Sequence, residues 1–180
     1  MIRVVIADPH PVYPETLSHM LNAQAGISVT AFCSVNSHLP GMISQLQPDV
    51  LLLDPSIKHH PEDDIIKKIR KIANCKIICL SMHSHPAYAK KMFCYGVDGF
   101  VTKDAPIEEL VQAIQEVLKG NQYTCKETAA LLADADMDPI LPVTEESAAV
   151  PSEPVAVKEK KEGGWLFRLF RPGLGLKHAG

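Results

Sequence analysis

The sequence predicts an α/β fold in which one parallel sheet is covered by helices on both faces. Short, β-branched apolar runs alternate with longer amphipathic stretches from residue 1 to about residue 119, and this alternation is typical of such a sheet. A chain of 180 residues, 46% hydrophobic and 22% charged, has enough apolar material for one ordinary domain with an appendage. We therefore expect one globular α/β domain followed by a segment of different character.

Five strands are expected, one at each apolar run. The runs are 2–7 (IRVVIA), 27–32 (ISVTAF), 49–53 (DVLLL), 76–80 (KIICL) and 98–102 (DGFVT). Most of them lack a strict apolar and polar alternation, and near-continuous apolar runs are typical of strands buried on both faces. The chain therefore predicts a sheet without a solvent-exposed face.

Amphipathic stretches of helical length lie between and after these runs. They cover 11–24, 36–46, 62–72, 86–95 and 106–119. The last has the clearest limits, because Pro106 suits a first helical turn and Gly120 suits a helix end. A further short helix is expected at 126–134 (KETAALLAD), packed by its Ala/Leu face on the same domain.

The composition changes near residue 134, so we divide the chain into a domain at 1–133, a linker at 134–162 and a C-terminal motif at 163–180. The linker holds eight acids, three lysines, four prolines and no aromatic residue, which predicts disorder. The motif combines aromatic, apolar and basic side chains, namely Trp165, Leu166, Phe167, Arg168, Phe170 and Arg171. Two helical turns of about 10 Å are too short to be stable alone, so the motif would gain order from a protein partner, a membrane surface or the domain itself.

Charge and cysteine content limit the class of protein. Eighteen Lys and Arg against 21 Asp and Glu give a net charge of −3, so the whole molecule lacks the basic field of a nucleic-acid-binding protein. Five scattered cysteines predict reduced thiols and a cytoplasmic location. Neither a secretion signal nor a membrane-spanning run is expected. We expect the protein to be soluble or, at most, peripherally attached to a membrane.

Polar side chains stand where four of the expected strands end. Asp8 follows the first strand, Asp54 the third, Ser81 the fourth, and Lys103 comes just after the fifth. Ligands of an open parallel sheet collect outside the carboxyl ends of its strands, so these groups are expected at one edge. Two carboxylates, a hydroxyl and an ammonium suit phosphoryl transfer, in which acids hold Mg²⁺, one acid is the nucleophile, and Lys and Ser bind phosphoryl oxygens.

Around these positions the chain resembles the receiver domain of bacterial two-component response regulators, in the branch usually fused to a helix-turn-helix domain. The motifs that carry the resemblance are IADPHP at 6–11, QPDVLLLD at 47–54, LSMH at 80–83, GVDGFVTKDA at 96–105 and GNQY at 120–123. They occur in order over about residues 1–130 and are specific only in combination. The resemblance implies a flavodoxin-like fold with five strands in the order 2-1-3-4-5.

The resemblance also implies roles for single residues. Asp54 would accept a phosphoryl group, and Lys103 would contact the phosphoryl oxygens. Ser81 and Phe100 would occupy the two switch positions. The family often has Tyr where Phe100 stands, so the aromatic switch would be kept without its hydroxyl, and packing alone would set its inward and outward states.

Two departures from the family weaken the expected Mg²⁺ site. The family carries an acidic pair after the first strand, whereas Pro9 follows Asp8 here and has no carboxylate. The metal ligands would then be Asp8, Asp54 and Ser56. Lys58 stands where the family usually has proline, and its ammonium could partly substitute for the ion. We expect weakened Mg²⁺ binding and no other cofactor, and we leave open whether Asp54 is phosphorylated.

Four histidines, His59, His60, His83 and His85, lie on loops of the same edge. Imidazole is a common ligand of transition metals. Loop histidines usually face solvent, however, and neither a cysteine nor a paired carboxylate completes a ligand set around these four. We do not expect them to form a metal site.

The function expected is that of an atypical receiver in phosphorelay signalling, which is not an enzyme and acts through protein contacts. Its partners would be a sensor histidine kinase or another signalling protein and an unknown target of the C-terminal motif, with membrane contact and a homodimer as further options. The 46 residues after Asp134 are too few and too acidic for the helix-turn-helix domain, so sequence-specific DNA binding is not expected. The alternative is a degenerate receiver that serves as a scaffold or adaptor, recruited through its C-terminal motif.

Overall fold

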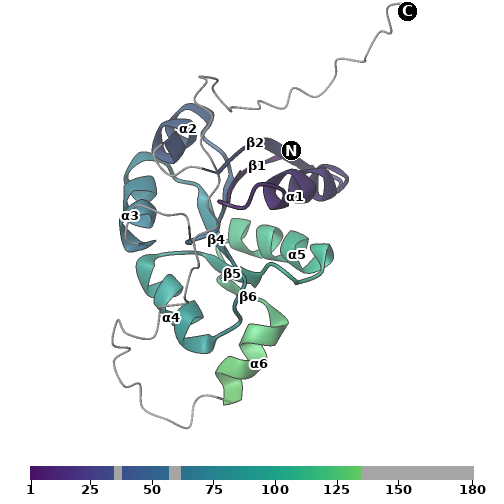
Figure 1. Cartoon of the computed structure of the whole chain (residues 1–180), viewed down its shortest axis with the longest axis vertical. Helices are drawn as coiled ribbons and strands as arrows, with labels where there is room; N and C mark the ends of the chain where they lie inside the picture. Colours follow the sequence, from purple (N-terminus) through teal and green to yellow (C-terminus); the bar gives the residue numbers. More distant parts are fainter. Residues whose placement is uncertain (35–37, 57–61, 135–180) are drawn as a thin grey trace, which may run out of the picture.

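Strands and helices alternate along the chain in the computed structural model, which describes residues 1–34, 38–56 and 62–134 (Figure 1). The strands are β1 (Ile2–Ala7), β2 (Ile27–Cys33), β3 (Val50–Leu53), β4 (Lys76–Ser81), β5 (Gly99–Thr102) and β6 (Tyr123–Thr124). The helices are α1 (Tyr13–Asn22), α2 (Leu39–Leu46), α3 (Glu62–Ile72), α4 (Pro86–Tyr95), α5 (Ile107–Leu118) and α6 (Lys126–Asp134). Lys58, nearly all of the predicted linker and the whole C-terminal motif lie outside the described residues.

The six strands form one parallel sheet in the order β2-β1-β3-β4-β5-β6. The predicted α/β fold and the order of the first five strands are confirmed. The prediction of five strands misses β6, which pairs in parallel with the outer side of β5 through hydrogen bonds from Tyr123 N to Asp98 O (3.1 Å) and from Cys125 N to Phe100 O (3.0 Å). The unpaired backbone groups of an edge strand favour this kind of addition.

The first two helices begin near a proline. α1 begins at Tyr13 instead of the predicted residue 11. α2 is described from Leu39, and its predicted start at residue 36 lies outside the described residues. Each has a proline in its first turn, Pro14 in α1 and Pro40 in α2. Proline is favoured there because the N–H it lacks would have no helical partner. Among the described residues, no helix is long and apolar enough to cross a bilayer.

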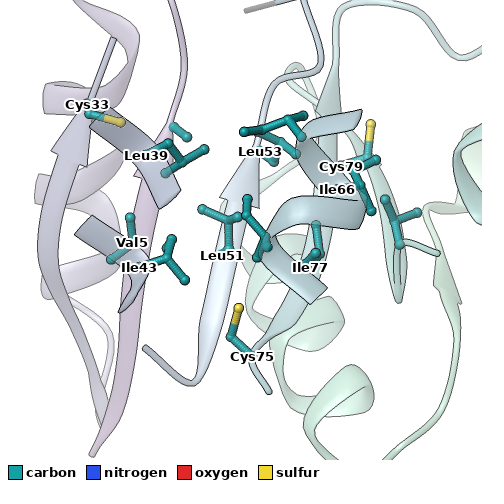
Figure 2. Close-up of a cluster of buried hydrophobic side chains, with 14 of the residues drawn as sticks. Val5, Cys33, Leu39, Ile43, Leu51, Leu53, Ile66, Cys75, Ile77 and Cys79 are labelled. Atoms are coloured by element: carbon teal, nitrogen blue, oxygen red, sulfur yellow. The ribbon is translucent and has the colours of Figure 1, made fainter. Parts of the chain in front are cut away.

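Helices cover both faces of the sheet, α1 and α5 on one face and α2, α3 and α4 on the other (Figure 1). Successive side chains of a strand point to opposite faces. Leu51 and Ile77 therefore pack toward α2 and α3 in the cluster of Figure 2, while Leu52 and Ile78 pack toward α1 and α5. Because both faces are buried, the strands are held rigidly and their carboxyl ends stay together.

The cysteines act as small apolar residues. Four are buried and Cys94 is exposed, and none of the five, all of which are described, is in a disulfide. Cys75 and Cys79 belong to the same buried cluster (Figure 2). Burial raises the pKa of the Cys75 thiol, which keeps that thiol protonated at neutral pH. The cytoplasmic location inferred from these cysteines stays a prediction.

Arg70 on α3 joins three neighbouring segments. Its Nη1 donates to Cys75 O (2.6 Å), its Nε and Nη2 donate to Gly96 O (3.1 and 2.7 Å), and Nη2 also pairs with the carboxylate of Asp98. Asp98 in turn accepts from Ile77 N at 2.8 Å. One guanidinium thus ties α3 to the loops before β4 and β5 through charge-assisted hydrogen bonds.

Replacing Arg70 by alanine is expected to lower the free energy of unfolding by about 1–3 kcal/mol, because two backbone carbonyls and the Asp98 carboxylate lose the hydrogen bonds from the guanidinium. Urea denaturation followed by far-UV circular dichroism measures the change. Lys71→Ala is the matched control, since Lys71 is the next residue of the same helix and is exposed. Equal stability of the Arg70 and Lys71 variants would contradict the role assigned to Arg70.

Candidate functional site at the carboxyl edge of the sheet

The sheet itself positions three charged residues, each of which directly follows a strand. Asp8 follows β1, Asp54 follows β3 and Lys103 follows β5. Their backbone N–H groups continue the strand pairing by donating to a carbonyl of the neighbouring strand, from Asp8 to Cys33 (3.0 Å), from Asp54 to Ala7 (2.8 Å) and from Lys103 to Ser81 (2.8 Å). The three side chains therefore leave the same edge of a rigid scaffold, as expected at the carboxyl ends of parallel strands.

Lys103 bridges the two carboxylates. Its Nζ pairs with Asp54 Oδ2 and lies 2.5 Å from Asp8 Oδ2. The three side chains are 4%, 5% and 0% exposed respectively. Two buried carboxylates and one ammonium carry a formal charge of −1, and burial of such charges is costly unless they are paired. Lys103 is thus the cation that compensates the cluster among the described residues; the predicted role of Lys58 lies outside them.

His10 completes the cluster from the loop after β1. Its backbone N donates to Asp8 Oδ1 at 2.9 Å, and its ring Nδ1 lies 2.7 Å from the same oxygen. Nδ1 is also 3.1 Å from Lys103 Nζ and 3.7 Å from Asp54 Oδ2. Nδ1 donates to Asp8 when it carries a proton and accepts from Lys103 when it does not. The imidazole is half exposed, so it forms the outer wall of the cluster.

Sequence reasoning did not select His10 as a site residue. The signal was present, since His10 lies two residues after Asp8, at the turn where the family places its second acid and this chain has Pro9. A residue two positions beyond a strand can turn back over the strand end. Whether it does so depends on the loop backbone, which here is held by the hydrogen bond from His10 N to Asp8.

Tyr13 at the start of α1 lies against Lys103. The Lys103 Nζ stands 4.7 Å from the centre of the Tyr13 ring, in a cation–π arrangement. Burial raises the pKa of Tyr13 well above its usual range, and the negative charges of Asp8, Asp54 and Asp104 raise it further. Tyr13 therefore stays a neutral phenol and holds the ammonium by its ring face.

The other predicted positions lie close to the cluster without joining its ion pairs in the described part of the chain. Ser81 is buried at the end of β4, and its Oγ accepts from His83 N at 3.0 Å. The backbone N of Ser56 donates to Asp54 Oδ1 at 2.7 Å. Phe100 points into the core, fully buried, with its ring edge-on to Tyr88 at 6.1 Å between centroids. The ring is therefore in the inward of the two states that the resemblance implies.

The donors at this edge match Mg²⁺ poorly. Mg²⁺ prefers an octahedron of oxygen ligands, whereas the groups gathered here are two carboxylates, an imidazole nitrogen and the Lys103 ammonium. Donor atoms of Asp8, His10 and Asp54 all lie within 4.8 Å of one another. Asp8 Oδ2 accepts no hydrogen bond from the described residues and has only its ion pair. The cluster thus has the spacing of a cation site but a mixed donor set.

Comparison with known protein families finds one match over most of the described chain. The response regulator receiver domain family matches residues 4–115. The oxygen regulatory protein NreC of Staphylococcus aureus is 30% identical over 166 residues, which cover 89% of this chain and 73% of that protein. The response regulator GacA of Pseudomonas aeruginosa is 26% identical over 140 residues, which cover 77% of this chain and 65% of that protein. Against further NreC sequences the coverage of the relative falls to 57%.

Solved structures agree with the sequence relatives. The crystal structure of a two-component response regulator of the LuxR family from Aurantimonas sp. superposes with a TM-score of 0.68 at 26% identity, covering 73% of this chain and 95% of that one. The isolated receiver domain of RcsB from Salmonella enterica serovar Typhimurium, determined with the phosphomimetic BeF₃⁻, gives a TM-score of 0.66 at 25% identity. This match covers 73% of this chain and 98% of that one.

Lys103→Met is expected to lower the free energy of unfolding by about 3–5 kcal/mol at neutral pH, because it leaves two buried carboxylates without a counter-charge. Asp8→Asn in the same chain should recover about 1–3 kcal/mol of that loss by removing the repulsion. Urea denaturation of the wild type, both single variants and the double variant gives the coupling energy. Strictly additive effects would show that Lys103 and Asp8 do not interact.

Proposed function

The chain belongs to the response regulator receiver domain family, and we propose that it is a signalling receiver in which Asp54 accepts a phosphoryl group and contact with other proteins transmits the result. The observation that carries this proposal is the buried Asp54 carboxylate, positioned by β3 and paired with Lys103. A carboxylate beside a fixed cation, at the carboxyl edge of a parallel sheet, suits nucleophilic attack on phosphorus.

The transfer uses groups of this edge and a phosphodonor. A carboxylate oxygen of Asp54 forms a bond to phosphorus while the bond between phosphorus and the donor breaks, and the bonding electrons leave with the donor group. Ser56 N holds Oδ1 by a hydrogen bond, and Oδ2 faces Lys103. Lys103 then balances the added negative charge of the phosphoryl group. We expect any contribution of Mg²⁺ to be weak, because the edge offers two carboxylates, an imidazole and an ammonium instead of a set of oxygen ligands.

A phosphoryl group on Asp54 would change the groups at the ends of β4 and β5. The Ser81 hydroxyl, which accepts from His83 N, is the side chain predicted to bind a new phosphoryl oxygen. Phe100 lies on β5 against Tyr88 of α4, so a change at β5 would reach the outer surface of α4. We propose the surface of α4, β5 and α5 as the output face, without enzymatic action on another molecule.

The proposed phosphodonor is a sensor histidine kinase, in keeping with the two-component regulators that the chain resembles. The similar RcsB receiver domain was determined with a phosphomimetic, which supports phosphoryl chemistry at the corresponding edge. We further propose that residues 165–171 bind a protein target. The chain would act in the cytoplasm and without sequence-specific DNA binding.

A second candidate is a scaffold or adaptor that works without phosphorylation. The observation that favours it is the replacement of the second acid by Pro9, together with a cluster already compensated by Lys103. In that case the receiver domain would be a rigid body, and the C-terminal motif would recruit it to an assembly.

Deletion of residues 163–180 is expected to leave the response to a phosphodonor intact, because the phosphoacceptor edge is built from β1, β3 and β5. In cells, tagged full-length and shortened chains should both show phosphodonor-dependent output. A scaffold or adaptor predicts a different result. Deletion would then abolish localisation and function, and neither chain would respond to the phosphodonor.

Incubation of the chain with acetyl phosphate and Mg²⁺ is expected to add the mass of one phosphoryl group, detected by intact-protein mass spectrometry. The adduct should be absent in Asp54→Asn, because the amide is not a nucleophile for phosphorus. Asp49→Asn is the matched control, since Asp49 lies at the opposite end of the same strand. An adduct that persists in Asp54→Asn, or its absence from every chain, would refute phosphorylation at Asp54.

A further inference from the structure

We propose that residues 134–157, the first part of the acidic linker, dock on a basic surface of their own receiver domain. We name this surface the α3–α4 face and define it by the exposed lysines of the two helices, which are Lys67, Lys68, Lys71, Lys90 and Lys91. The docking does not require phosphorylation of Asp54, so the inference goes beyond the proposed function.

Charges of opposite sign are segregated along this chain. Residues 65–97 contain seven Lys and Arg and no Asp or Glu. Residues 134–157 contain six Asp and Glu and no Lys, Arg or His. The net charge of −3 therefore hides two segments of nearly equal and opposite charge. Such segments attract each other wherever the fold allows them to meet.

The fold gathers most of the basic segment on one surface. α3 and α4 are neighbours on the same face of the sheet (Figure 1). Each helix buries its apolar stripe against the sheet, and the buried residues are Ile65, Ile66 and Ile69 of α3 and Ala89 and Met92 of α4. The lysines occupy the remaining positions and are exposed to solvent. α4 contains no acid, and the acids of α3 occur only in its first turn.

Three of the exposed lysines have no counter-charge among the described residues. Asp98 already neutralises the other basic groups of this region, since it pairs with Arg70 and lies 3.3 Å from Lys76 Nζ. The proposal rests on the exposed lysines that form no ion pair with another described residue, which are Lys68, Lys71 and Lys90. Neighbouring ammonium groups repel one another, so an occupant with negative charge stabilises this surface.

The linker starts beside this surface. α6 packs against α4 and ends at Asp134, where the linker begins (Figure 1). An extended chain advances by about 3.4 Å per residue, so ten linker residues exceed the length of α4, which is about 15 Å. A tethered segment has an effective concentration of the order of millimolar. Several weak ion pairs are therefore enough to hold the linker on its own domain.

A docked linker would compete with other molecules for α4. We proposed α4 as part of the output face, so this consequence, unlike the docking itself, rests on the proposed function. A second copy of the chain carries the same acidic segment and could occupy the same lysines. The experiments below separate that outcome from docking within one chain.

The first test is carbodiimide crosslinking of the full chain, which joins a carboxylate to an ammonium only where the two are in contact. An equal mixture of ¹⁵N-labelled and unlabelled chains is crosslinked and mapped by peptide mass spectrometry. Crosslinks should join residues 134–157 to Lys68, Lys71 or Lys90 within chains of one label. Their yield should fall at least fivefold when the salt concentration rises from about 0.02 M to about 0.5 M, because salt screens exposed charges.

Crosslinks found only between chains of different label would overturn the proposal in favour of a second copy as the occupant. Equal crosslinking of residues 134–157 to Lys119 would overturn it as well. Lys119 is an exposed lysine at the end of α5, on the opposite face of the sheet.

The second test is the radius of gyration of the full chain, measured by small-angle X-ray scattering as salt is added. An undocked acidic linker contracts because salt screens its self-repulsion, whereas a docked linker is released and the radius should rise. The double variant Lys71→Gln with Lys90→Gln should start with a larger radius than the wild type and contract. The matched control, Lys119→Gln with Lys126→Gln, removes the same charge elsewhere and should keep the wild-type rise.

Circular dichroism checks that both double variants are folded, which is expected because all four lysines are exposed. Contraction of the wild type on addition of salt, or the same salt response in both double variants, would overturn the proposal. Docking without an acetyl phosphate adduct would retain this inference while refuting phosphorylation.

Discussion

Two buried carboxylates that share one buried ammonium are the interaction on which the chemistry of this chain depends. Removal of Asp8 and Asp54 from water carries a large free-energy cost, and Lys103 offsets it only because its ammonium reaches both side chains. That reach requires β1, β3 and β5 to end at the same level. The parallel register provides this, since the residue after each strand still hydrogen-bonds to a neighbouring strand.

The apolar layers on both faces make the edge rigid. Leu51 and Leu52 belong to opposite clusters, so β3 is held between helices from both sides. A close-packed interior resists the movement of a strand end by even a fraction of an ångström. The charged cluster therefore has a fixed geometry, and the half-exposed His10 ring is its most accessible member.

The edge departs from the family pattern in the loop after β1. Pro9 removes an acid, and the ring of His10 lies within hydrogen-bond distance of Asp8. The missing acid lowers the negative charge of the edge, while Asp54 keeps its place after β3.

The added edge strand β6 and the helix after it are tied to α5. Glu109 of α5 accepts hydrogen bonds at Oε1 from Tyr123 Oη of β6 (3.3 Å) and from Lys126 N at the start of α6 (2.7 Å).

The sequence by itself determined the α/β class, the order of the first five strands through its family motifs, and the meeting of Asp8, Asp54 and Lys103. These features follow from local apolar runs and from the residue types at strand ends, which a single chain displays directly. Only the tertiary structure decided that β6 joins the sheet, that Lys103 compensates both acids, and that His10 turns into the cluster. Each of these features depends on contacts between residues far apart in the chain or on the path of a loop backbone. The spacing of residues along the sequence specifies neither the long-range contacts nor the loop path.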